Sequence, residues 1–346
     1  MSQATTKATS ALVSIAALVV IIAGMKSASA LIVPFIFSIF IAIICAPALT
    51  WLTRHRVPNV LAVIVILLAV ILAGMLLSIA IGSSMQQFAR EIPGYQVNLQ
   101  AQYNGMITWL ASYGIEIQGQ GIREAFDPRS AIRWVNQLLA GLGYLFTNAF
   151  LIIFTVLFIL LEISSFPMKL RELVKPGGRE LAFSGHFLTS VQRYFGLKTL
   201  TSLATGAVVT IMLLIVGVDF PILWGLVAFL LNYIPNIGSI IAAVPAVLLA
   251  LVQFGLSSAI GVASGYVIIN IVIGSLLEPR IMGKGMGLSP LVVFVSLVFW
   301  GWVFGPIGMI LSVPLTMLAK LAFEDREETR WLAVLLGSNV PRNPEA

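Results

Sequence analysis

Residues 220–277 read FPILWGLVAFLLNYIPNIGSIIAAVPAVLLALVQFGLSSAIGVASGYVIINIVIGSLL. These 58 consecutive residues include no Asp, Glu, Lys or Arg. About 20 apolar residues are enough for a helix to cross the ~30 Å hydrocarbon core of a bilayer. As one continuous helix the stretch would measure roughly 87 Å, which is too long for a single crossing. It therefore predicts a membrane-embedded segment that is broken, and the Asn, Pro and Gly residues of 232–238 mark the break.

The whole chain has the composition of a membrane protein. Of its 346 residues, 59% are hydrophobic and 10% are charged, against about 45–50% and about 25% in soluble domains. A soluble protein of this size would lack the polar groups to coat its surface. Its single cysteine, Cys45, has no partner for an internal disulfide, and its two histidines add no Cys/His metal-binding spacing. The sequence predicts neither a metal nor a cofactor.

The net charge of +6 does not indicate a nucleic-acid partner, because the Lys and Arg residues lie in short loops between apolar runs. Loops rich in Lys and Arg face the cytoplasm in membrane proteins. By this rule Arg54, Arg56 and the basic segment 162–198 are cytoplasmic, and the nearly neutral segment 83–133 lies outside. Both termini are then cytoplasmic, and the lipid bilayer is the expected environment.

Charge-free intervals give the expected number of spans. They are 8–25, 27–53, 57–89, 134–161, 199–218, 220–277 and 285–319. We expect an all-α polytopic membrane protein with about eight apolar segments, because no alternation of polar and apolar residues indicates a transmembrane barrel. The first interval, followed by Ala28-Ser29-Ala30, also fits a cleaved signal peptide. We expect it to be retained as a helix, since one cation precedes it and the next span follows almost at once.

The expected organisation has six parts. They are N-terminal transmembrane helices at 1–82, a small periplasmic helical cap at 83–135, a transmembrane helix at 136–163, a cytoplasmic amphipathic linker at 164–197, a transmembrane core at 198–320 and a cytoplasmic tail at 321–346. Helical spacing of the apolar residues Met106, Trp109, Leu110 and Tyr113 indicates the cap.

Two stretches of the core, at about 221–253 and 288–319, look alike. The outer prolines lie 24 residues apart in both, at Pro221 and Pro245 and again at Pro290 and Pro314. We expect two hairpins of inverted topology, turning at 232–238 and at 301–306. Paired apolar segments interrupted by Gly and Pro indicate the binding site of a transporter. Two ordinary kinked helices are the alternative.

Polar and aromatic groups near these breaks are the candidate site residues. For substrate binding they are Asn232, Pro235, Asn236, Gly238, Asn270, Trp300 and Trp302, with helix capping as the alternative role of Asn236. Glu278 and Arg280 are a candidate coupling site or gate, or alternatively an interfacial anchor. The candidate hinge residues are Gly283, Gly285, Gly287, Gly305 and Pro306.

Several strings in this half are specific to a family. They are Trp224-Gly225, LNYIPNIG at 231–238, LEPRIMG at 277–283, GLS at 287–289, SLVFWGW at 296–302 and LSVPLT at 311–316. They resemble the autoinducer-2 exporter family of bacterial membrane proteins, and a weaker similarity extends along nearly the whole chain. The resemblance implies an inner-membrane protein, a homo-oligomeric and pentameric assembly, and export of autoinducer-2, a small polyhydroxylated furanone-derived signal.

Three functions remain open on this basis. The first is export of autoinducer-2 by alternating access, and the second is Na⁺(Li⁺)/H⁺ antiport through Glu278, because some members of the family are linked to antiport. The third is a non-transporting scaffold or receptor whose outer segment binds a partner. The sequence does not predict an enzyme, since it has no nucleophile–His–acid arrangement. The glycine-rich stretch 283–287 also lacks the Lys-Ser/Thr pair of a nucleotide-binding loop.

Overall fold

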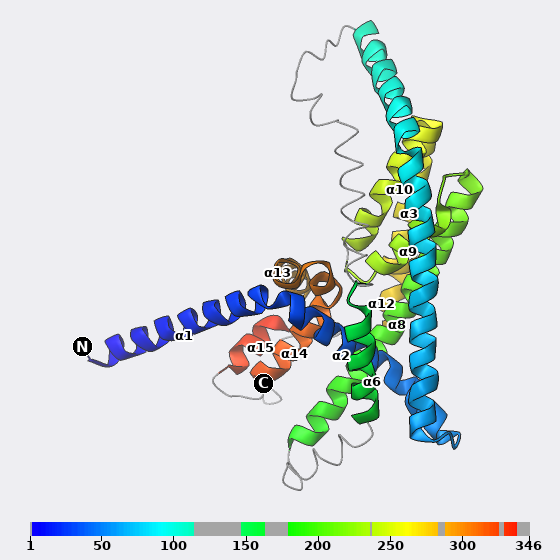
Figure 1. Ribbon diagram of the computed structural model, residues 1–346. Coiled ribbons are helices and arrows are strands. Elements are labelled where there is room, and N and C mark those ends of the chain that lie inside the picture. Colours follow the sequence, from blue (N-terminus) through cyan, green and yellow to red (C-terminus); the bar gives the residue numbers. More distant parts are fainter. Residues whose placement is uncertain are drawn as a thin grey trace. The chain divides into compact units, whose positions relative to one another are not determined.

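The computed structural model describes residues 2–113, 147–162, 179–235, 237–282, 288–324 and 329–337. Within these ranges every regular element is a helix (Figure 1). The helices are α1 (Ser2–Ser27), α2 (Ser29–Arg54), α3 (Asn59–Ser112), α6 (Ala149–Glu162), α8 (Arg179–Val216), α9 (Pro221–Leu231), α10 (Gly238–Phe254), α11 (Leu256–Ile269), the π-helix η1 (Asn270–Leu277), α12 (Glu278–Met282), α13 (Pro290–Ile310), α14 (Ser312–Glu324) and α15 (Arg330–Leu336). The predicted all-α class is confirmed.

The described helices include five that are long and apolar enough to cross a membrane. These spans are Ser29–Arg54, Asn59–Phe88, Val191–Val216, Leu256–Ile281 and Pro290–Ile310, and four shorter apolar helices accompany them. Large apolar side chains such as Phe150 and Ile215 are 80% exposed, as expected of a surface that meets lipid. The chain is a multi-pass membrane protein, as its composition predicts.

The chain divides into two compact units, and each holds one of the predicted hairpins. Unit 1 consists of 1–47, 150–175 and 286–346, and it contains the hairpin formed by α13 and α14. Unit 2 consists of 48–149 and 176–285, and it contains the hairpin formed by α9 and α10.

In unit 2, α9 packs against both α8 and α10, and α11 packs against α10 and α8. The long helix α3 runs along α9 and α10 (Figure 1). The core includes Trp224, whose side chain is fully buried and whose ring meets Phe88 of α3 edge-on at 5.9 Å. Aromatic pairs of this geometry add to the stabilisation that burial alone provides.

The first hairpin turns at 232–238, as predicted. The Ile234 N–H donates to the Leu231 carbonyl at 2.8 Å, and the Gly238 N–H donates to the Ile234 carbonyl at 3.3 Å. Gly238 begins α10 so close to the end of α9 that a Cβ at this position would overlap the Leu231 carbonyl. The turn therefore requires glycine for close approach of two backbone segments.

The second hairpin turns inside α13, at the predicted segment 301–306. Gly305 has φ 68° and ψ −151°, a conformation that is essentially restricted to glycine. The chain reverses there, so that a Cβ on Gly308 would overlap the Trp300 carbonyl. Each hairpin thus has a proline in its turn, followed within three residues by a glycine whose added Cβ would overlap a backbone carbonyl of the preceding limb.

Two helices continue through positions where the sequence changes in polarity. α3 is one 54-residue helix from Asn59 to Ser112, so the described part of the predicted cap, up to residue 113, is an extension of a membrane helix. α8 likewise crosses from the predicted linker into the core without a break at residue 198. In both helices the side chains change between apolar and polar, but the backbone remains one continuous helix.

Candidate functional site

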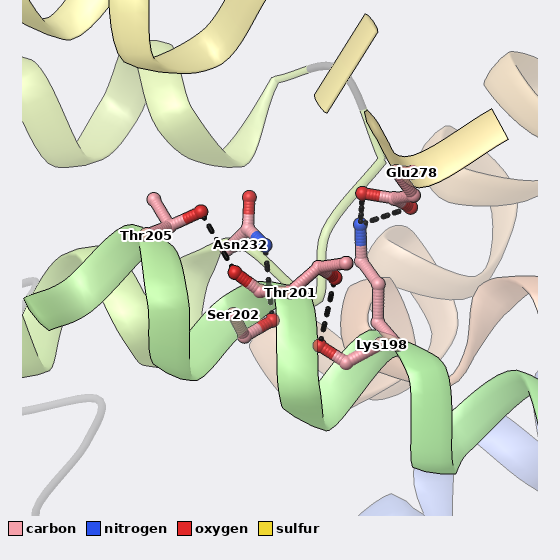
Figure 2. Close-up of polar contacts among 6 residues, drawn as sticks. All are labelled: Lys198, Thr201, Ser202, Thr205, Asn232 and Glu278. Atoms are coloured by element: carbon pink, nitrogen blue, oxygen red, sulfur yellow. Dashed lines mark hydrogen bonds and ion pairs between the residues drawn. The ribbon is translucent and has the colours of Figure 1, made fainter. Parts of the chain in front are cut away.

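A strip of buried polar residues runs along α8 in unit 2. Lys198, Thr201, Ser202 and Thr205 are 0–5% exposed, although they lie in the apolar span Val191–Val216. Their spacing of three or four residues places them on one face of the helix. Figure 2 shows this strip facing Asn232 and Glu278, which come from other segments of unit 2. We call these four residues of α8, together with the half-buried Thr199 beside them, the α8 strip.

An ion pair closes one end of the α8 strip. The Lys198 Nζ donates to Glu278 Oε1 at 2.7 Å and to Oε2 at 3.0 Å. The two side chains are only 6% and 15% exposed. Charges so far from water require a partner, because burial penalises each charged form strongly. The pair therefore ties α8 to the first residue of α12.

Amide and hydroxyl groups form the rest of the site. The Asn232 Nδ2 donates to the Ser202 Oγ at 3.0 Å, and the Tyr233 hydroxyl donates to the Thr199 Oγ1 at 2.8 Å. Asn232 and Tyr233 lie in the turn of the first hairpin, so two side-chain hydrogen bonds hold this turn against α8. The hydroxyls of Thr201 and Thr205 donate to carbonyls of α8 itself, at 3.1 Å and 2.9 Å.

This arrangement suits recognition of a small hydroxylated molecule. Each side-chain hydrogen bond contributes a net stabilisation of only about 1 kcal/mol, so solute hydroxyls can replace these partners at little cost. The charges of Lys198 and Glu278 cancel locally, so the site has no strong preference for the sign of a ligand's charge. Among the described residues, no group of three or more His, Cys, Asp or Glu could hold a metal ion.

Three of the predicted unit 2 residues shape this site directly. Asn232 is a side-chain ligand of the α8 strip, while Pro235 and Gly238 form the turn that presents it. Asn270 is the first residue of η1, one helix segment before Glu278. Asn236 lies outside the described residues, as do the predicted hinge residues Gly283, Gly285 and Gly287.

Glu278 belongs to the site, whereas Arg280, the other residue of the candidate coupling site or gate, is exposed. The Glu278 carboxylate binds Lys198. Two residues along an α-helix point about 200° apart, since each residue turns the helix by about 100°. A neighbour 80 positions away in sequence therefore pairs with Glu278 instead.

The predicted residues of the second hairpin belong to unit 1. The Trp300 Nε1 donates to the Thr316 Oγ1 at 3.0 Å, which joins α13 to α14. Trp302 is 56% exposed, and the Lys26 ammonium lies 3.8 Å from the centroid of its ring. Gly305 and Pro306 form the turn. These residues support the second hairpin, and the site described above consists of unit 2 residues alone.

Sequence reasoning missed the α8 side of the site. It counted Lys198 as a cation of a cytoplasmic loop, although the positions after it read TLTSLAT. Four hydroxyl residues within seven positions, at the entry to an apolar span, are the signal that could have identified this strip. Buried polar residues in membrane spans usually face the protein interior and mark functional paths.

A second polar cluster in unit 2 fastens α3 to the loop before α9. The Tyr95 hydroxyl donates to Asp219 Oδ2 at 2.8 Å, the Gln253 amide donates to the same oxygen, and the Trp224 Nε1 donates to the Asp219 carbonyl at 3.1 Å. Burial and the neighbouring Asp219 carboxylate raise the pKa of the Tyr95 phenol. Tyr95 therefore remains a protonated donor over the physiological pH range, and Asp219 joins α3, α9 and α10.

Replacing Tyr95 by Phe is expected to loosen this attachment, because it removes a donor to a carboxylate and leaves the ring in place. A hydrogen bond to a charged group contributes about 1.5–3 kcal/mol. Hydrogen–deuterium exchange of the backbone near residue 95 should become faster by more than tenfold. Asp219→Asn keeps an acceptor oxygen at the same place and should have a smaller effect. Unchanged exchange in Tyr95→Phe would show that the bond does not hold α3.

Comparison with known proteins gives a consistent picture. The family model described as AI-2E family transporter matches residues 15–327. The AI-2 transport protein TqsA of Escherichia coli K12 is 41% identical over 319 residues, which cover 92% of this chain and 93% of that protein. A candidate transport protein of Haemophilus influenzae is 39% identical over 332 residues, covering 94% and 95% of the two chains. The candidate transport protein YhhT of Escherichia coli K12 is 34% identical, with 96% and 95% covered.

Proposed function

Because the chain belongs to the AI-2E family of transporters, we propose that it exports autoinducer-2 across the bacterial inner membrane by alternating access. The observation that carries this proposal is the contact between the α8 strip and the turn of the first hairpin, where amide and hydroxyl groups meet in an otherwise apolar span. Such a site suits an uncharged, polyhydroxylated solute. The name of the relative TqsA supports the same substrate.

In this mechanism the solute enters between α8 and the hairpin turn. Its hydroxyls replace the Asn232–Ser202 and Tyr233–Thr199 hydrogen bonds, which are 3.0 Å and 2.8 Å long in the closed arrangement. The exchange leaves the number of hydrogen bonds nearly unchanged, so it costs little. Separating the turn from α8 opens the site on one side, and re-forming the two bonds closes it.

Uptake of purified autoinducer-2 into proteoliposomes tests the proposal. We expect saturable flux, measured with and without imposed Na⁺ and H⁺ gradients. Flux without any gradient identifies a facilitative carrier, and flux that requires a gradient identifies coupled export. If neither condition gives flux above that of empty liposomes, autoinducer-2 is not the substrate.

Asn232→Ala is expected to lower autoinducer-2 flux by roughly five- to thirtyfold, because it removes an amide that the solute would bind. Loss of one such hydrogen bond corresponds to roughly 1–2 kcal/mol. Ser78→Ala is the matched control, since the Ser78 hydroxyl donates only within α3, to the Gly74 carbonyl at 2.8 Å. Normal flux in Asn232→Ala, with the protein correctly assembled, would remove this residue from the binding site.

Antiport of Na⁺ or Li⁺ against H⁺ is the second candidate, and the Lys198–Glu278 pair favours it. A carboxylate in a protein-lined membrane site, with a cation 2.7 Å away, is the kind of group that exchanges protons and metal ions in transporters. Glu278→Gln should then abolish proton movement that is driven by a Na⁺ gradient in vesicles. Retention of that activity would exclude Glu278 as the coupling residue.

The proposal includes an orientation and an assembly. Both termini face the cytoplasm, in agreement with the distribution of Lys and Arg between loops, and several copies of the chain form a homo-oligomer, a pentamer by family resemblance. Cysteine accessibility at the two ends of the chain tests the orientation, and mass measurement in detergent tests the assembly.

A further inference from the structure

The span that contains Glu278 changes its winding immediately before this residue. The helix is α-helical from Leu256 to Ile269, π-helical from Asn270 to Leu277, and α-helical again from Glu278. A π-helix joins each residue to the fifth along the chain rather than the fourth, so it holds more residues per turn. Such turns are rare and occur frequently at functional sites. Here the π-helix ends immediately before the residue that binds Lys198.

The winding of η1 determines the direction in which Glu278 points. In an α-helix one residue corresponds to a rotation of about 100°. Rewinding a π-turn as an α-turn advances every later residue by about that angle, because the same residues then complete more of a turn. Leu277 would take the direction now held by Glu278, and Glu278 would turn away from Lys198. The contact of 2.7 Å would be lost.

The packing of the span permits this change within η1. On α11, the residues Val262, Tyr266 and Ile269 are buried, which fixes the upstream helix against its neighbours. Of the eight residues of η1, all described, only Ile273 is buried. Segments with few buried contacts rearrange at a low free-energy cost.

Gly274 adds local freedom in the middle of η1. A Cβ at this position would lie 2.9 Å from the Asn270 Oδ1, so the side chain of Asn270 extends forward along its own helix toward Gly274. An amide in this position can bond to backbone groups that lose their partners while the winding changes. Asn270, which the sequence makes a candidate substrate ligand, would thereby stabilise the backbone of η1 while its winding changes.

We propose that η1 is a register switch of the transport cycle: in the π-wound state it holds Glu278 against Lys198, and in the α-wound state it releases Glu278. The inference rests on the proposed transport function and names the part that moves. Release frees the end of the α8 strip next to Thr201 and Ser202, where the solute would bind. The switch moves one turn of helix, in addition to the separation of the hairpin turn from α8.

Cross-linking between α8 and the span tests the switch without any substrate. In a chain carrying Cys45→Ala, which has no other cysteine, Lys198→Cys is combined with Glu278→Cys, or with Leu277→Cys plus Glu278→Gln. The second combination avoids an unpaired carboxylate. With bifunctional thiol reagents of stepped length, we expect cross-links at both 278 and 277. Leu276→Cys plus Glu278→Gln is the control, since position 276 faces Lys198 in neither register.

Deletion of one residue tests whether the switch is needed. Removing Val272, an exposed residue of η1, lets this segment wind as an α-helix while Glu278 stays in place. We expect the cross-link at 278 to remain, the cross-link at 277 to disappear, and autoinducer-2 flux to fall at least tenfold in the otherwise native chain. Deleting Ser264 from the regular helix α11 is the control: it turns Glu278 back by about 100°, so that a cross-link at 278 then reports only the α-wound state of η1.

Two results would overturn the proposal. One is that, in the chain without the deletion, a cysteine at position 277 never cross-links to the cysteine at position 198, with or without autoinducer-2. The other is a Val272 deletion that transports at the wild-type rate. If the native chain moves no autoinducer-2, the proposed substrate fails while the cross-linking still tests the switch. If the deletion variant does not fold, the cross-links at 277 and 278 in the full-length chain still show whether both registers of η1 occur.

Discussion

Lys198→Met is expected to destabilise the protein by about 3–5 kcal/mol, the cost of leaving one member of a buried ion pair without its partner. Glu278 is 15% exposed, so its carboxylate would lose its countercharge without gaining much water. Thermal unfolding in detergent, followed by loss of the monodisperse peak in size-exclusion chromatography, measures the effect. The apparent unfolding temperature should fall by several degrees, because such losses correspond to a few degrees per kcal/mol in proteins of this size.

The double variant Lys198→Met with Glu278→Gln separates pairing from burial. It removes both charges, and replacing a buried pair by neutral groups is often nearly neutral for stability. We therefore expect the double variant to be more stable than Lys198→Met alone. Lys320→Met is the control, because its pair with Glu324 is longer, at 3.5 Å, and more exposed, and such pairs contribute about 0–1 kcal/mol. Equal losses for Lys198→Met and Lys320→Met would contradict the importance of burial.

Gly238→Ala and Gly308→Ala are expected to prevent correct folding of the first and second hairpin, respectively. In each case the added methyl group would overlap a backbone carbonyl, that of Leu231 or that of Trp300. Backbone atoms cannot move aside as the end of a side chain can, so the turn itself must open. We expect a loss of at least about 3 kcal/mol, at the upper end of the range for overpacking, measured as the fraction of protein that remains monodisperse after extraction.

Gly261→Ala provides the matched control for both substitutions. Gly261 lies in α11, and beyond the adjoining backbone of its own helix nothing lies within 4 Å of the position that its Cβ would take. Alanine is favoured over glycine by up to about 1 kcal/mol in a helix, so this variant should be as stable as the wild type or more stable. If Gly238→Ala or Gly308→Ala behaved like Gly261→Ala, the tight turns described above would not exist.

Much of the fold follows from composition and from the positions where Pro and Gly interrupt the apolar helices. The charge-free runs predict the spans because a bilayer excludes unpaired charge. The prolines and glycines predict both turns because they interrupt the helical ladder at Asn232–Gly238 and at Gly305-Pro306. The inverted topology of the hairpins stays a prediction, as does the division of the chain into a membrane part and a cap.

The sequence predicts only some of the residues of the candidate site, for a physical reason. Asn232 and Glu278 are visible in sequence because they interrupt apolar runs, whereas Lys198 and Ser202 become site residues only through contacts 80 and 30 positions away. The π-helix is equally hidden, since Asn270–Leu277 has the same apolar composition as an α-helical span. Whether the segment winds as a π-helix or an α-helix depends on tertiary packing, which the local sequence does not reveal.

The unbroken α3 has a practical consequence for imaging the protein. Its 54 residues measure roughly 81 Å at 1.5 Å per residue, well over twice the ~30 Å hydrocarbon core. A large part of this rod must therefore stand in water beyond the lipid or detergent belt. A helical protein fused in phase at its far end, or an antibody fragment raised against that end, would serve as an alignment marker for electron microscopy of this small membrane protein.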